Sequence, residues 1–208
     1  MATWTSFYIN TSQKEAVVQK LAGLTDDLVR TNDAEFPADI GQYHMIDTKR
    51  APTYMAIGNP QSEWTTIVHN SFSKLDAWGL LLSKHFSCKL IVTMAQSVSS
   101  SYYFALYENG IKLREIETCY TEDFDEINFG NPFSFENPRP GKKSGPEGKE
   151  DYIFSFVSIE EYCAQFNLAI QTDYGPVSWT LLRGKGIRNE VQDYVRKLMV
   201  KKPWWKFW

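Results

Sequence analysis

Lysine and aromatic side chains gather at the end of the chain, where they could together bind a protein, a membrane surface or a nucleic acid. From Arg183 to Trp208 there are eight Lys/Arg and two Asp/Glu, a formal charge of +6, whereas the residues before Arg183 carry −9. Such charge asymmetry is a clue to binding partners. The candidate binding residues are Lys201, Lys202, Trp204, Trp205, Phe207 and Trp208.

Four interpretations of this segment stay open. Burial stabilises large aromatic side chains, so docking of residues 188–208 on the same domain is favoured. Lysines facing anionic headgroups, with tryptophans at the interface, would suit a membrane surface, which is not the favoured partner. Tryptophan anchors would equally suit a protein partner. Stacking of bases on these rings is least favoured, because the chain as a whole is acidic and nucleic acid is not an expected partner.

Candidates for catalysis are sparse. The three histidines, His44, His69 and His85, have no His-x-x-x-His or His-Glu-x-x-His spacing. His69 ends a predicted strand and His85 lies near the end of a predicted helix, so the two could meet in the folded chain. With Glu63 they are the candidates for a catalytic site assembled from distant residues. Purely structural histidines remain the favoured interpretation.

Motifs for phosphate, dinucleotide and metal binding are incomplete. Gly148-Lys149 is followed by glutamate where a phosphate loop needs Ser or Thr. Gly184-Lys185-Gly186 lacks the third glycine of a dinucleotide fingerprint. The acidic run 122–126 has neither the glycine nor the alternating ligands of a calcium loop. We therefore expect no cofactor and no metal site, and the balance leans away from an enzyme.

Composition is that of an ordinary globular protein. The 208 residues are 43% hydrophobic and 15% aromatic, which suits one α+β domain over residues 1–208. The three widely spaced cysteines favour reduced thiols in the cytoplasm over a disulfide framework. The first residues lack the pattern of a secretory signal, and no apolar run is long enough for a transmembrane helix.

The first half of the chain alternates predicted strands and helices. A strand at 5–10 precedes a helix opened by a Ser12/Glu15 capping box. Strands at 53–57 and 64–68 flank a turn at 58–62, and a helix capped by Ser73 then leads to a strand at 89–94. Gly79 falls inside the apolar stripe of that helix, where it would allow a close approach to the sheet. The order β-α-β-β-α-β is that of the split βαβ, ferredoxin-like arrangement.

The second half is led by a clear hairpin. Strands at 102–107 and 111–116 flank Asn109-Gly110, whose positive-φ preference predicts a type I′ turn. Simple alternation would place Lys112, Arg114 and Ile116 on one side of the second strand, opposite Ile111, Leu113 and Glu115. Residues 130–150 are predicted as a mobile loop within the domain. A strand at 152–157, a helix opened by Ser158 and Glu161, a short strand at 179–182 and a helix from Asn189 to Pro203 complete the order.

The expected architecture is therefore α+β, an antiparallel or mixed sheet with helices on one face, extended by a hairpin and a C-terminal helix. The expected function is non-catalytic binding of another protein, as in a small acidic protein that neutralises a bacterial toxin, a type that fits by analogy alone. An enzyme with a site built from distant residues and a peripheral membrane-surface protein are the alternatives.

Overall fold

The computed structural model describes residues 3–26, 28–37, 40, 52–59, 63–119, 126–136, 142–144, 150–152, 154–170, 178–184 and 186–187. Three α-helices and a short 3₁₀ helix lie within these ranges: α1 (Lys14–Gly23), α2 (Asp76–Phe86), α3 (Phe156–Ala164) and η2 (Ser134–Glu136). The strands are β1 (Thr3–Ile9), β2 (Thr25–Asp26), β3 (Val29–Ala34), β4 (Tyr54–Ile57), β5 (Thr65–His69), β6 (Lys89–Gln96), β7 (Ser101–Glu108), β8 (Ile111–Thr118), β9 (Ile127–Phe129), β10 (Lys142–Ser144), β11 (Glu150–Tyr152), β12 (Trp179–Arg183) and β13 (Gly186–Ile187).

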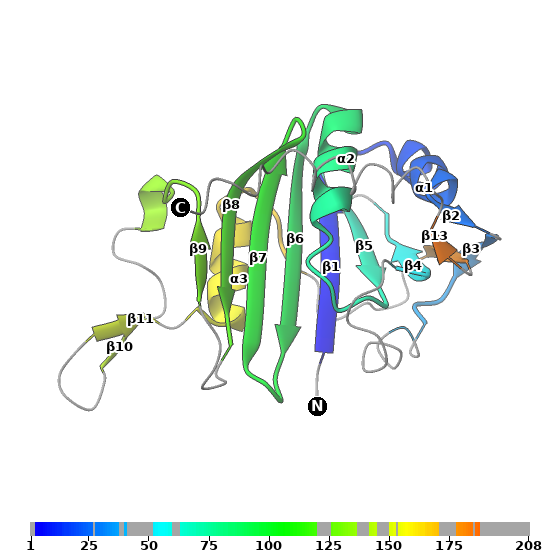
Figure 1. Ribbon diagram of the computed structural model, residues 1–208. Helices are drawn as coiled ribbons and strands as arrows, with labels where there is room; N and C mark the ends of the chain where they lie inside the picture. Colours follow the sequence, from blue (N-terminus) through cyan, green and yellow to red (C-terminus); the bar gives the residue numbers. More distant parts are fainter. Residues whose placement is uncertain are drawn as a thin grey trace, which may run out of the picture.

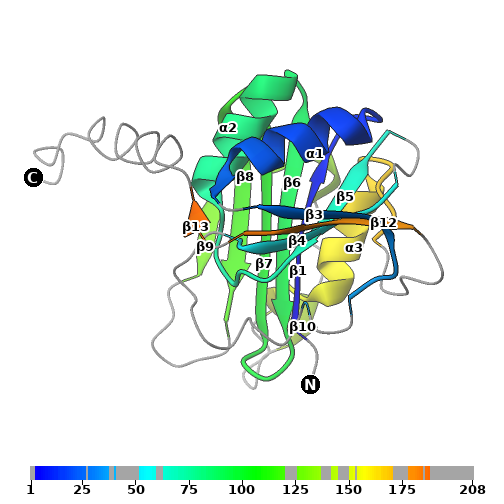
Figure 2. The same ribbon diagram turned by 90° about the vertical axis from the view of Figure 1, so that its right-hand side faces the viewer.

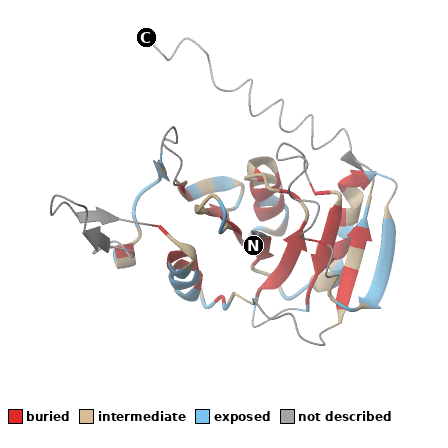
Figure 3. Cartoon of the chain, turned by 90° about the horizontal axis from the view of Figure 1, so that it is seen from below, coloured by how far each residue is buried: buried red, intermediate tan, exposed pale blue. Residues whose placement is uncertain are grey.

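Nine of the described strands form one sheet in the order β3-β12-β4-β5-β1-β6-β7-β8-β9. Every neighbouring pair in it is antiparallel. Its central strands are buried, whereas β3 at one edge is almost wholly exposed, as Figure 3 shows for the pale blue strand on its right. The α+β class and the antiparallel sheet expected from the sequence are confirmed.

Both faces of the sheet are covered. Side chains alternate along β1, so that Phe7 and Ile9 pack under α1 and α2 while Tyr8 packs under α3 on the other side. We call these the α2 face and the α3 face (Figures 1 and 2). The helices were expected on one face of the sheet, which holds for α1 and α2 only. Because both faces of the inner strands are buried, they are apolar at consecutive positions, and that pattern cannot show which face a later helix will cover.

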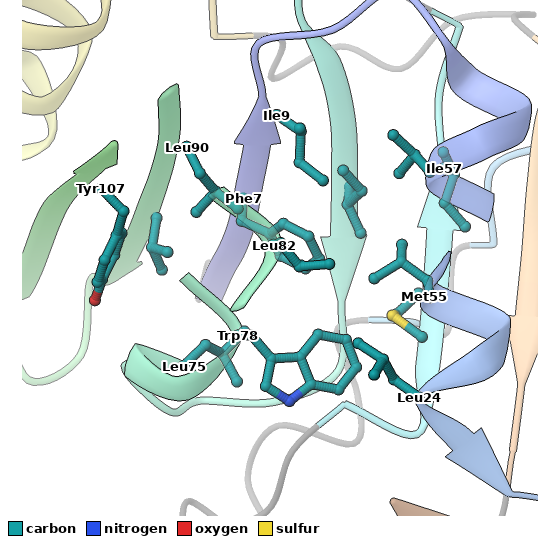
Figure 4. Packing of buried hydrophobic residues seen from close by; sticks show 14 of the residues in the cluster. Phe7, Ile9, Leu24, Met55, Ile57, Leu75, Trp78, Leu82, Leu90 and Tyr107 are labelled. Carbon is teal, nitrogen blue, oxygen red and sulfur yellow. The ribbon is translucent and has the colours of Figure 1, made fainter. Parts of the chain in front are cut away.

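The core of the α2 face forms around Trp78 and Leu82 of α2, which pack on Phe7 and Leu90 of the sheet (Figure 4). Gly79 lies directly on the ring of Tyr107, and a Cβ added to it would come within 2.6 Å of that ring. The close approach expected of this glycine is confirmed, and it brings the start of α2 down onto β7.

The hairpin of β7 and β8 is also confirmed. Asn109 and Gly110 have φ of 51° and 82°, as a type I′ turn requires. The register departs from simple alternation, because Leu106 pairs with Arg114 whereas Tyr107 pairs with Lys112, which leaves Leu113 as an extra residue in a bulge. The bulge moves Lys112 to the same face as Glu115, so the prediction that these two lie on opposite sides is wrong.

Several predicted helix starts are displaced. The N-cap positions of α1 and α2 are Gln13 and Leu75, and neither makes a side-chain cap hydrogen bond, so the capping box expected at Ser12 and the N-cap expected at Ser73 do not form. Helix α3 starts at Phe156 with a reciprocal Ser155–Ser158 capping box, so the strand predicted at 152–157 is wrong at Phe156 and Val157, which are helical, whereas Tyr152 belongs to β11. A serine–serine box satisfies the same N–H groups as the expected serine–glutamate pair.

The remaining predictions concern the second half of the chain, part of which lies outside the described residues. The short strand at 179–182 is confirmed as part of β12. The segment 130–150, expected to be a loop, contains η2 and β10, and Glu136 of η2 is buried. The predicted helix from Asn189 and the aromatic tail lie outside the described residues. Within the described part of the chain, no helix is long and apolar enough to cross a membrane.

Candidate functional site

The candidate site is a network of charged side chains on the α2 face, where β7 and β8 extend past α2. Tyr103 and Tyr107 of β7 point to this face and belong to its core. The Tyr107 hydroxyl donates a hydrogen bond of 2.5 Å to Asp76, the first residue of α2. The close approach at Gly79 thus places a carboxylate at the end of a buried phenol.

Asp76 is part of a larger group of two lysines and three carboxylates, which extends from the start of α2 over β8. Lys112 Nζ lies 2.6 Å from Asp76 Oδ1 and 2.7 Å from Glu115 Oε2. Lys74 Nζ lies 3.6 Å from Glu115 Oε1 and also forms an ion pair with Glu117. We call this set the lysine–carboxylate network: Lys74, Asp76, Lys112, Glu115 and Glu117.

The strand register builds this network. Tyr103 pairs with Glu117, and Ala105 with Glu115, so carboxylates stand opposite buried residues of β7. The bulge at Leu113 then turns Lys112 onto the same face, over the ring of Tyr107 at 5.7 Å from its centroid. Lys74 lies over Tyr103 at the same distance. Each lysine is therefore held by carboxylates and by the face of a tyrosine.

The two tyrosines are neutral in this environment. Burial, together with the nearby Asp76 carboxylate, raises the pKa of Tyr107 well above its usual range. Burial likewise raises the pKa of Tyr103 well above its usual range. Both phenols stay protonated at neutral pH, since a buried phenolate would lose its hydration beside existing negative charge.

A small pocket adjoins the network at Glu117. Its volume is about 70 Å³. Its lining includes the polar residues Ser101, Glu117 and Cys119. The apolar lining comes from Phe72, Met94, Tyr102 and Tyr103. An aromatic pocket with a carboxylate on its wall is suited to a cation.

On the opposite face, a buried ion pair joins β8 to η2, and the same arginine also binds β9. Arg114 binds Glu136 with two hydrogen bonds of 2.9 and 2.7 Å, and each side chain is 1% exposed. Arg114 Nη1 also donates to Asn128 Oδ1 at 2.6 Å and to the carbonyl oxygen of Phe129 at 2.7 Å. We call this arrangement the clamp, and it holds the edge strand β9 against β8.

Acid should weaken the clamp. Burial raises the pKa of Glu136, but hydrogen bonds from Arg114 and the Phe133 N–H outweigh it, so the net pKa is lowered. A carboxylate with a lowered folded-state pKa contributes its full stability above the ordinary value of about 4.3, and loses it as pH falls through the folded value. Urea unfolding of wild type and Glu136→Gln should therefore give stabilities that converge as the pH falls from about 4.3 towards the lowered folded-state pKa. A difference that stays constant over that range would contradict this assignment.

The sequence-predicted catalytic residues lie apart. His69 is fully buried at the end of β5, where its Nδ1 accepts from the Ser71 N–H at 3.2 Å. Glu63 precedes the start of β5, roughly 20 Å away at about 3.3 Å per residue. His85 is exposed on α2, and partial burial together with Lys20 lowers its pKa. A catalytic role for these residues stays a prediction.

Glu63 does line a depression, on the α3 face, of about 370 Å³ with Trp64, Phe166 and Asn167. The Trp64 indole N–H donates to the Phe166 carbonyl oxygen there at 3.1 Å. His44 and the six tail residues predicted to bind lie outside the described residues. Within the described ranges, no three His, Cys, Asp or Glu side chains come together as a metal site would require.

Sequence patterns did not identify the lysine–carboxylate network. In the sequence, its members look like solvent-facing charges of a strand and of the start of a helix. The bulge that places Lys112 on the same face as Glu115 cannot be recognised from the pattern of apolar residues. The positive-φ turn at 109–110 was the available indication of where β7 and β8 would meet. Comparisons of the chain with protein-family models, with curated proteins and with solved structures find no match.

Proposed function

We propose that this protein acts by binding another protein, without catalysis, through the edge of the sheet formed by β8 and β9. The observation that carries the proposal is a pair of exposed apolar side chains near the lysine–carboxylate network. Leu113, at the bulge of β8, is 38% exposed, and Phe129, which pairs with Glu115, is 51% exposed. Exposed aromatic and aliphatic anchors rimmed by charged groups are the composition of a protein interface.

The pairing of β9 with β8 brings the exposed Phe129 next to the lysine–carboxylate network. Phe129 of β9 pairs with Glu115, and Ile127 pairs with Glu117, so the edge strand lies directly beside the network carboxylates. Strand β9 is three residues long and ends the sheet. A partner that covered Phe129 would therefore also meet the charges of β8, which would orient it.

The opposite edge is a weaker candidate. Strand β3 also ends the sheet, and its Val29 is 63% exposed. The residues that follow are polar or charged, Arg30-Thr31-Asn32-Asp33, and such edges resist pairing with other chains. Val29 therefore serves as a matched control for Phe129.

Replacing Phe129 with aspartate should reduce capture of the partner by at least about tenfold, as loss of a central interface anchor does. Tagged protein would be used as bait in an extract of its source cells, bound proteins would be quantified by mass spectrometry, and the enriched partner would be purified for affinity measurement. Val29→Asp should leave the affinity unchanged. Equal affinity of Phe129→Asp and wild type would remove this edge from the proposal.

We also infer that β1, α1, β4, β5, α2 and β6 form a split βαβ core of the ferredoxin-like type. The support is the local order β4-β5-β1-β6 with antiparallel neighbours, together with α1 and α2 on the same face. Strands β2 and β3 are inserted between α1 and β4. This type of core hosts many functions and so adds nothing to the choice among them.

The other hypotheses have narrower support. An enzyme built around Glu63 would use the depression beside Trp64 and would need a group other than the distant His69 and His85. The membrane-surface and tail-binding hypotheses concern Lys201, Lys202 and the aromatic residues 204–208, outside the described residues. A reducing, cytoplasmic location is proposed because all three cysteines are thiols.

A further inference from the structure

We propose that the pocket beside Glu117 binds a small organic cation, and that this cation is the ammonium or guanidinium group of a side chain on the protein partner. The proposal deepens the proposed function by naming what the partner presents. The affinity of the pocket for a free cation can be measured without that partner.

The net charge of the lysine–carboxylate network favours the binding of a cation. The lysine–carboxylate network holds three carboxylates, those of Asp76, Glu115 and Glu117, against the ammonium groups of two lysines. The two tyrosine hydroxyls beside it stay neutral, because the pKa of each is raised. The network thus carries one negative charge in excess. The side chains of Glu115 and Glu117 are only 9% and 17% exposed, and a carboxylate so withdrawn from water is stabilised by a further positive group.

The volume and the lining of the pocket also favour a cation. Glu117 contributes to its wall beside Phe72, Tyr102 and Tyr103. A volume of about 70 Å³ suits the end of a lysine or arginine side chain rather than a whole metabolite. Ser101 and Cys119 supply further polar atoms on the wall, which could accept hydrogen bonds from a cationic donor.

The protein already places one cation, the ammonium group of Lys74, on this surface. Lys74 Nζ pairs with Glu117 and lies 5.7 Å from the centroid of the Tyr103 ring. Lys74 also has a second carboxylate, Glu115, within 3.6 Å. It can therefore keep one carboxylate when an incoming cation takes Glu117. A carboxylate accepts several hydrogen bonds, so Glu117 can bind Lys74 and the incoming cation at the same time.

The position of the pocket connects it with the proposed interface. Glu117 pairs with Ile127 and Glu115 pairs with Phe129, on consecutive positions of the same face of β8. A partner segment lying along β9 with an apolar side chain on Phe129 would therefore carry its cation toward Glu117. We infer that the partner presents a basic residue close to an apolar one.

The test uses the whole protein labelled with ¹³C in its methionine methyl groups, with n-butylammonium as the probe. Met94 lines the pocket, whereas Met55 is buried in the same core away from it, so the Met94 methyl should shift saturably and the Met55 methyl should not. The expected Kd is roughly millimolar for so small a ligand. Neutral n-butanol should bind at least about tenfold more weakly, because it lacks the charge.

Two substitutions should change the affinity in opposite directions. Glu117→Gln should weaken butylammonium binding by about tenfold, and Lys74→Met, which removes the competing cation, should strengthen it by about threefold. Glu108→Gln, which alters a carboxylate paired with Lys89 outside the pocket, should have no effect. Opposite effects of the two substitutions could not come from a common loss of folding.

The proposal is overturned if the Met94 methyl does not respond, if butanol binds as well as butylammonium, or if Glu117→Gln leaves the affinity unchanged. Each outcome is separate from the partner experiment. Loss of cation binding with Phe129-dependent capture intact would remove only the pocket. Cation binding without Phe129-dependent capture would remove the edge as the interface.

Discussion

Replacing Arg114 with methionine should lower the free energy of unfolding by about 3–5 kcal/mol, the usual cost of removing one partner from a buried ion pair. The substitution leaves the Glu136 carboxylate buried without its two hydrogen bonds from the guanidinium. It also deprives Asn128 and the Phe129 carbonyl oxygen of a donor, so β9 is held to β8 by its backbone pairing without the bonds from the arginine side chain. Urea unfolding followed by tryptophan fluorescence would measure the change.

A second arginine–glutamate pair provides the control. Arg30 binds both oxygens of Glu15 at 2.8 and 2.7 Å, so the geometry is alike, but the two side chains are 34% and 58% exposed. Water and salt screen such a pair, and Arg30→Met should change stability little. The double substitution Arg114→Met with Glu136→Leu should recover most of the lost stability, since it leaves no buried charge. Equal effects of Arg114→Met and Arg30→Met would show that burial does not govern the clamp.

The sequence predicts best where one short segment determines its own conformation. Asn109 and Gly110 favour positive φ whatever surrounds them, and the hairpin forms as expected. The apolar runs of β1 and β6 identify them as strands because residues are buried on both faces. Strand β3 was missed because nearly all of its positions are exposed, so it has no apolar alternation.

Contacts between distant segments were beyond such prediction. Arg114 is paired with Glu136 of η2, which lies in a segment whose glycines and prolines indicate a loop. The bulge at Leu113 forms in the pairing of β8 with β7, and it decides which face Lys112 takes. The candidate site depends on that single extra residue. Its charges were visible in the sequence, but their common face was not.

Replacing Gly79 with alanine should lower the free energy of unfolding by about 1–3 kcal/mol, although alanine is the better helix former. The new methyl group would come within 2.6–2.7 Å of three atoms of the Tyr107 ring, so helix or ring must shift. The ring cannot move easily, because Tyr107 is fully buried and its hydroxyl is held by Asp76. Thermal and urea unfolding would measure the loss.

The matched substitution is Gly23→Ala at the end of α1, where an added Cβ would meet nothing within 4 Å. That change should be neutral or stabilise by up to about 1 kcal/mol, through helix propensity alone. If Gly79→Ala behaved in the same way, α2 would not be held against β7 by this contact. In a Tyr107→Leu background the clash disappears, so Gly79→Ala should then cost nothing. The disappearance of this cost in the Tyr107→Leu background would show that one glycine sets the height of α2 over the sheet, and with it the position of Asp76 in the lysine–carboxylate network.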